Sequence, residues 1–271
     1  MNEFETYVKR YHTSHRKPYT FFGQGKEDII GVELEFDSDK RGLELAPFRD
    51  ACAKLLAERE DTDHYFIEKD SSLLYGFEIV TQPHSVEEMK KFFTKFSEVF
   101  PQLMELGATD EAHRAALHVH VSRESFGKTA EERMENIAKI ICFIANNADD
   151  WRQAGRRKEF RKCDVRTDLN TKEAALAYVQ ETEGIPLLQR RKIDRYVAIN
   201  LRNKNTVEFR TMQTTFVLET IFAEIDFVMH LVHRAKELSW EDVLNGKKWF
   251  ENVAENVATY LKSREAFVQY L

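Results

Sequence analysis

Cysteine, proline and glycine are all scarce in this 271-residue sequence, which contains 3 Cys, 5 Pro and 10 Gly. Three widely spaced cysteines give neither a disulfide framework nor the paired spacing of a zinc site, and they are typical of reduced thiols. No apolar run approaches the roughly 20 residues that cross a bilayer. The N-terminal residues also lack the apolar core of a signal peptide. We therefore expect a cytoplasmic protein with no membrane partner.

A basic excess is missing as well. Lys and Arg total 40 against 46 Asp and Glu, a net charge of -6, which argues against a nucleic-acid partner. Apolar material is plentiful, because hydrophobic residues make up 42% of the chain and Phe alone contributes 20. This composition excludes a disordered chain and predicts a sizeable core. The length favours one large domain over two small ones.

Strand-like and helix-like patterns alternate along the chain. The expected strands are 29–37, 64–69, 75–81, 116–122, 195–201 and 206–212. The expected helices are 45–59, 85–107, 129–151 and 171–180, with helices over most of 216–271. The strands lack the long apolar runs of a parallel sheet, so we predict an α+β fold, an antiparallel sheet with helices packed on one face. The predicted organisation is an N-terminal extension (1–28), a core (29–215) and C-terminal helices on that core (216–271), in a single domain.

Five of these strands combine an apolar face with a face of functional side chains. In the first strand, for example, Val32 and Leu34 alternate with Glu33 and Glu35, and successive side chains of a strand point to opposite faces. If the strands share one sheet, a single surface gathers these polar residues: Glu33, Glu35, Glu78, His118, His120, Asn200, Glu208 and Arg210.

Carboxylates crowded on one surface repel each other unless cations lie between them. Oxygen-rich sites with an imidazole suit Mg²⁺ or Mn²⁺. Zinc fits less well, because no cysteine joins the set and carboxylates dominate it. Any one of these strands alone is typical of the exposed side of an amphipathic strand. Their combination in one chain favours a functional site.

The order of four short motifs resembles the amidoligase family, within the glutamine synthetase and glutamate–cysteine ligase superfamily of carboxylate–amine ligases. The motifs are Gly31-x-Glu33-x-Glu35, then Asp70-Ser-Ser-Leu with Gly76-x-Glu78-Ile-Val, then His118-x-His120-x-Ser122, then Asn200 with Thr206-Val-Glu208-Phe-Arg210. The similarity spans about 29–215. It implies a core like the catalytic domain of glutamine synthetase.

The resemblance also implies roles for individual residues. The implied metal ligands are Glu33, Glu35, Glu78, His118 and Glu208. Arg210 matches the arginine that neutralises phosphoryl or carboxylate oxygens, and we expect it to act in catalysis with Glu78 and Asp70. The residues expected to bind nucleotide or substrate are His120, Asn200, Arg202, Arg156 and Arg157.

A basic loop and a turn also bear on the resemblance to this family. The basic loop that contains Arg156 and Arg157 resembles the family's arginine loop, although charged runs are commonly just solvated loops. The family's Asp-Gly-Ser turn is Asp70-Ser71-Ser72 here, so the local turn can differ. A Walker-type glycine-rich loop is absent, but this superfamily holds ATP phosphates with metals and arginines.

The implied activity is an ATP- and divalent-metal-dependent ligase that joins a carboxylate to an amine through an acyl phosphate. Its cofactors are ATP and Mg²⁺ or Mn²⁺, and its partners are small-molecule amine and carboxylate substrates, such as amino acids or peptides. Oligomerisation stays open, as does the general base, for which Glu78, Asp70 and His120 are candidates. The alternatives are a metal-dependent hydrolase, a guanidino kinase, and a non-catalytic nucleotide- or metal-binding protein.

Overall fold

A computed structural model describes residues 19–23, 28–38, 40, 44–70, 73, 76–110, 115–156 and 163–271. These residues form helices and a mostly antiparallel sheet, which confirms the predicted α+β class. They fall into two compact units: 19–23, 29–118 and 213–218 form the first, and 28, 119–212 and 219–271 form the second. The predicted boundaries at 28/29 and 215/216 stay a prediction, as does the resemblance to glutamine synthetase.

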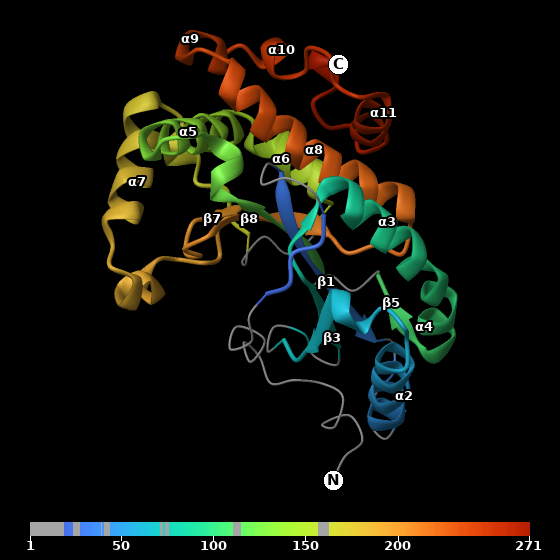
Figure 1. Cartoon of the computed structure of the whole chain (residues 1–271). Coiled ribbons are helices and arrows are strands. Elements are labelled where there is room, and N and C mark those ends of the chain that lie inside the picture. The colour runs from blue at the N-terminus through green and yellow to red at the C-terminus, as the bar shows by residue number, and fades with distance from the viewer. Residues whose placement is uncertain are drawn as a thin grey trace. The chain divides into compact units, whose positions relative to one another are not determined.

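The first unit contains short strands and the helices that follow them. Its strands are β1 (Ile29–Ser38), β2 (Tyr65–Glu68), β3 (Phe77–Thr81), β4 (His84–Ser85), β5 (Ala108–Thr109) and the start of β6 (Ala116–Ser122). Its helices are α2 (Leu45–Ala57), α3 (Val86–Phe96) and α4 (Phe100–Leu106). The strand order is β2-β3-β1-β6, with β4 and β5 also paired with β1. Figure 1 shows α3 and α4 beside these strands.

The two faces of β1 differ as predicted. Ile30, Val32 and Leu34 are buried on its apolar side. Glu33 and Glu35 alternate with these residues and therefore lie on the opposite side. In the antiparallel pairing with β3, Leu34 is opposite Ile79, and Glu35 is opposite Glu78. Because paired residues share a face of the sheet, one face is apolar and the other acidic.

Aromatic side chains of α3 fill the core beside the apolar face. Phe92, Phe93 and Phe96 are spaced to lie on one side of the helix, and all three are buried. Tyr65 of β2 packs against Phe96 edge to face, with ring centroids 5.3 Å apart. The hydroxyl of Ser85 accepts a hydrogen bond from the Glu88 N–H, which begins the helix as predicted.

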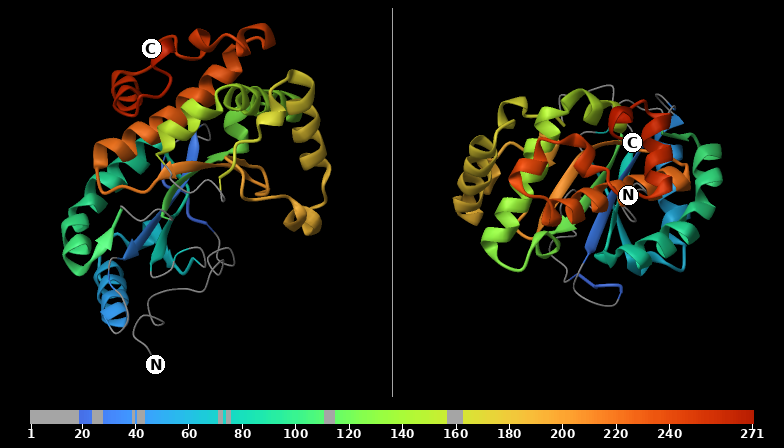
Figure 2. Two further views of the ribbon diagram at one scale, coloured as in Figure 1. Left: turned by 180° about the vertical axis from the view of Figure 1, so that it is seen from behind. Right: turned by 90° about the horizontal axis from the view of Figure 1, so that it is seen from above.

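The second unit is mostly helical. Its α-helices are α5 (Ala130–Asn146), α6 (Ala148–Gly155), α7 (Lys172–Gly184), α8 (Leu218–Glu237, of which Leu218 belongs to the first unit), α9 (Trp240–Val243), α10 (Gly246–Trp249) and α11 (Glu255–Ser263). Its part of the sheet has the order β6-β8-β7, with β7 over Ile199–Asn200 and β8 over Thr206–Gln213. In Figure 2 the orange helix α8 lies beside the yellow-green α6, where Trp151 packs against Phe227 at 5.6 Å between ring centroids.

Three predicted elements differ from the structure. The helix expected over 85–107 is divided into α3 and α4 by a 3-10 turn over Ser97–Val99. The helix expected over 129–151 is interrupted at Asn147, where the backbone leaves the helical region and α6 begins. The strand expected over 195–201 is reduced to Ile199–Asn200. Backbone groups of Tyr196 and Ala198 bond to Asp164, so this part of the chain is tied to a preceding loop. In the described part of the chain, helices long and apolar enough to span a bilayer do not occur.

A buried carboxyl group lies in the helical core of the second unit. Glu224 of α8 is 1% exposed, and burial raises its pKa to about 8. The Tyr260 hydroxyl lies 2.6 Å from the Ala154 carbonyl and 3.1 Å from Glu224 Oε1. Its single proton goes to the carbonyl oxygen, which can only accept. A protonated Glu224 then donates to the hydroxyl oxygen, in agreement with the raised pKa.

We expect Glu224→Gln to stabilise the protein more at pH 8 than at pH 5. Above pH of about 4.3 the unfolded carboxyl is ionised while the folded one keeps its proton, so stability falls as pH rises toward the folded pKa. Glutamine removes this penalty and can still donate to Tyr260. Thermal melts should show a gain at pH 8 that exceeds the gain at pH 5 by about 4 °C or more. An equal shift at both pH values would contradict a protonated Glu224.

Candidate functional site

A row of carboxylates crosses three strands of the first unit. Glu35 of β1 pairs with Glu78 of β3, and Glu78 pairs with Glu68 of β2. These three side chains share one face and are 1%, 3% and 1% exposed, respectively. Directly opposed like charges destabilise a sheet, and burial strengthens the repulsion. Such a row needs protons or cations to balance it.

Asp70 completes a compact set of oxygen donors. It follows β2 by two residues and is half-buried. Glu35, Asp70 and Glu78 each have one carboxylate oxygen that lies within 4.8 Å of the corresponding oxygens of the other two residues. The structure thus brings together two predicted metal ligands, Glu35 and Glu78, with the predicted catalytic residue Asp70.

The electrostatics of this set fit a divalent cation. Burial, reinforced by the charges of Glu33 and Glu35, raises the pKa of Glu78 well above its usual range, and Asp70 and Glu68 raise it further. A group that holds a proton because of its acidic neighbours is also one that a bound cation would ionise. All the donors are hard oxygens, which suit Mg²⁺ and Mn²⁺.

His118 lies next to the same carboxylates in the first unit. Its Nδ1 is 3.0 Å from Glu33 Oε2, and its Nε2 is 3.8 Å from Glu35 Oε1. The Ala116 N–H donates to Glu35 Oε2 at 2.7 Å. These contacts orient Glu35 and the imidazole before any ligand binds. His118 is 1% exposed, and Glu33 is the more accessible partner of the pair.

A second polar cluster surrounds Glu208 in the second unit. Asn200 is opposite Glu208 in the β7–β8 pairing, and its Nδ2 donates to Glu208 Oε2 at 2.6 Å. Arg210, two residues further along β8, forms an ion pair with Glu208 Oε1. His120 Nε2 lies 4.0 Å from the same oxygen. Glu208 is thus a buried carboxylate that orients a guanidinium and an amide.

The remaining predicted residues lie in several environments. The Arg202 N–H donates to Asn200 Oδ1 at 2.9 Å, so Arg202 adjoins this cluster through its backbone. Arg156 ends α6 in a left-handed conformation and is exposed. Arg157 lies outside the described residues. The predicted role of Glu208 as a partner of His118 at one metal ion stays a prediction.

Two residues near the acidic row were not expected from the sequence. Glu68 extends the row to β2, and the signal for it is the Glu68-x-Asp70 spacing, which repeats the spacing of Glu33 and Glu35. Tyr19 is the other. Its pKa is raised by burial and by the charges of Glu68 and Glu33.

No protein-family model and no curated protein matches the sequence. Among solved structures, the chain is similar to a bifunctional glutathione synthetase from Pasteurella multocida, with a TM-score of 0.45 and 10% sequence identity. The match covers 90% of this chain and 47% of that enzyme, so the chain spans about half of its length. A similarity at this level assigns neither a family nor an activity, and the resemblance to amidoligases stays a prediction.

Proposed function

We propose that this protein is an ATP- and divalent-metal-dependent ligase that joins a carboxylate to an amine. The observation that supports it best is the set of three close oxygen donors from Glu35, Asp70 and Glu78. The kind of ligase follows from the order of the motifs around these residues, which resembles that of the amidoligases. Amino acids and peptides are the proposed substrate class.

In this proposal the three carboxylates of the first unit hold a Mg²⁺ or Mn²⁺ ion. When bound, the ion neutralises phosphate oxygens of ATP. The hydrogen bond from Ala116 holds one oxygen of Glu35 in place. Glu33 orients the His118 ring through its Nδ1, which leaves Nε2 as the nitrogen directed toward Glu35.

Arg210 is the residue proposed to stabilise the phosphoryl group in the transition state of its transfer. A planar guanidinium matches two phosphate oxygens at once, and Glu208 keeps it in one orientation. Asn200 fixes the other oxygen of that carboxylate. The three residues therefore present a cation that does not need to reorganise when charge develops on the transferred group.

The proposed reaction has two steps. The carboxylate substrate attacks the γ-phosphorus of ATP, which breaks the bond to the bridging oxygen and gives an acyl phosphate and ADP. The amine, after losing a proton to a base, attacks the acyl carbon and displaces inorganic phosphate. The candidates for this base are Glu78, Asp70 and His120.

Hydroxylamine tests this function without knowledge of the natural amine. We expect the protein, incubated with ATP, Mg²⁺, hydroxylamine and a panel of amino acids and dipeptides, to form a hydroxamate with at least one of them. ADP should form in equal amount, and only when both the acid and hydroxylamine are present. Release of ADP at the same rate without either compound would instead indicate a hydrolase. Absence of both products over the whole panel would favour a binding protein.

A further inference from the structure

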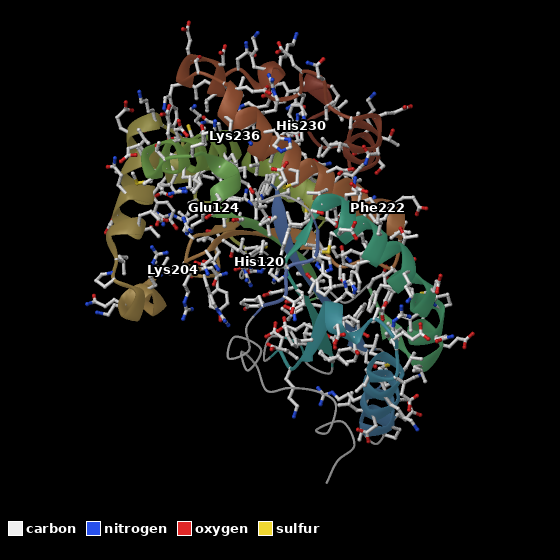
Figure 3. The ribbon with its side chains drawn as sticks, viewed as in Figure 1. His120, Glu124, Lys204, Phe222, His230 and Lys236 are labelled. Atoms are coloured by element: carbon white, nitrogen blue, oxygen red, sulfur yellow. The ribbon has the colours of Figure 1, made fainter. Side chains whose placement is uncertain are left out.

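The second unit contains a cavity of about 530 Å³ whose lining is rich in arginine. It lies between the end of β6, the N-terminal half of α5, the end of α7 and the segment after β7. Its cations are Arg123, Arg133, Arg190 and Lys204, and its acids are Glu124 and Glu183. Figure 3 labels Glu124, in the turn that follows β6, and Lys204, in the segment between β7 and β8. None of these residues belongs to the clusters described above.

The charges in this cavity do not balance. Arg123 and Arg190 share one carboxylate: Arg123 pairs with Glu183 Oε1, and Arg190 Nη2 lies 3.1 Å from Glu183 Oε2. Two guanidinium groups with one partner leave a positive charge uncompensated. Burial lowers the pKa of Arg123, and the nearby charges of Arg190 and Arg133 act in the same direction. An anion entering the cavity would relieve this repulsion.

Backbone contacts hold the buried part of this basic wall in place. Arg123 Nη2 donates to the Leu201 carbonyl at 2.9 Å and to the Asn203 carbonyl at 3.0 Å. Arg190 is also buried and directs Nη1 toward Leu201. Arg133 and Lys204 differ, because neither forms an ion pair with any residue that the structure describes. Their donors are the ones available to a ligand.

Part of the cavity lining is apolar. Ala130, Met134 and Ile137 line it from α5, at the spacing that places residues on one face of a helix. A volume of about 530 Å³ is in the usual range for pockets that take small organic molecules. The cavity therefore fits a molecule with an anionic end and an apolar end.

We propose that this cavity binds a phosphorylated small organic molecule. Arg133 and Lys204 contact the phosphate, and the Arg123–Arg190–Glu183 cluster supplies a fixed positive field. The apolar side chains of α5 (Ala130, Met134 and Ile137) contact the organic part. Phosphate suits this arrangement better than carboxylate, because its two negative charges and three terminal oxygens satisfy several separate donors. The proposal is independent of the ligase assignment, since it uses none of the residues assigned to that reaction.

Phenyl phosphate is a suitable probe, because it combines a phosphate with an apolar ring. Isothermal titration in EDTA keeps divalent ions, and hence the carboxylate site, out of the measurement. We expect phenyl phosphate to bind more tightly than inorganic phosphate and more tightly than benzoate. Arg133→Gln and Lys204→Gln should each raise the dissociation constant, about tenfold for Arg133, and Arg133→Lys should have a smaller effect.

Glu124→Gln tests the proposal in the opposite direction, because it should tighten phenyl phosphate binding instead of weakening it. This residue is exposed and lines the cavity, so removal of its charge should tighten phenyl phosphate binding by about two- to threefold. Lys262→Gln, an exposed lysine of α11, is the matched control and should leave binding unchanged. Melting curves of each variant check that it folds. Absence of binding at millimolar concentration, a preference for benzoate, or equal affinity in the double variant Arg133→Gln/Lys204→Gln would overturn the proposal.

Discussion

Replacement of Glu78 by glutamine is expected to lower turnover by about a hundredfold or more and, without metal, to raise the melting temperature. Glutamine has nearly the same shape but cannot supply the charge that a divalent ion requires. Burial and the neighbouring carboxylates raise the pKa of Glu78, so without metal the folded protein keeps this group protonated at a pH where the unfolded carboxyl is ionised, and this costs stability. Removing this cost should stabilise the protein by about 1 kcal/mol, a shift of about 2 °C or more.

The gain in stability should also depend on pH. Because the folded pKa of Glu78 is raised, the cost of keeping it protonated is present above the unfolded pKa of about 4.3 and vanishes below it. The gain from Glu78→Gln should therefore shrink as pH falls from 7.5 toward 4.5. Glu105→Gln, an exposed glutamate of α4, is the control and should change neither turnover nor melting temperature. A melting temperature lowered by several degrees would show that Glu78 has a structural role instead.

Arg210→Lys is expected to lower turnover by about a hundredfold or more, which is the usual effect of losing a hydrogen-bond donor to the transition state. Nucleotide affinity should fall only modestly. Lysine keeps the positive charge beside Glu208 but loses the two-pronged geometry that suits phosphate oxygens. Arg210 is only 12% exposed and held by a buried carboxylate. Steady-state kinetics of ADP release and equilibrium binding of a nucleotide analogue together separate the two effects.

Arg166 offers a close control for this substitution. It also pairs with an acid two residues away, since its Nη2 lies 2.6 Å from Asp168 Oδ2, but this pair is exposed. Arg166→Lys should leave turnover unchanged. If Arg210→Lys retained near wild-type turnover, Arg210 would be a structural partner of Glu208, and its assignment to phosphoryl transfer would be wrong.

The faces of the strands were predictable because strand side chains alternate with a period of two. Glu33 and Glu35 on one side of β1, and Leu34 on the other, follow from the sequence alone. The pairing of Glu35 with Glu78 does not. It depends on which residues of two separate strands come into register, and the segments between them set that register through three-dimensional packing.

Residues missed or misplaced by the sequence analysis have similar causes. Glu68 ends a short strand in which Phe66 and Ile67 are both apolar, so no clean alternation marks its face. The strand expected over 195–201 is shortened because backbone groups of Tyr196 and Ala198 bond to Asp164, about thirty residues earlier in the chain. Contacts of that range leave no periodic signal. The grouping of Arg123, Arg190 and Glu183 likewise arises only when separate elements fold together.

Electron paramagnetic resonance of Mn²⁺ tests the central claim, that Glu35, Asp70 and Glu78 bind a divalent ion. The signal of free Mn²⁺ decreases when the ion binds, so a titration gives the number of sites and the dissociation constant. We expect the wild-type protein to bind Mn²⁺ at this site, and Glu78→Gln and Asp70→Asn each to weaken that binding about tenfold or more, as loss of a charged ligand requires. Glu105→Gln should bind like the wild type. Equal Mn²⁺ affinity in the wild type, Glu78→Gln and Asp70→Asn would contradict the account.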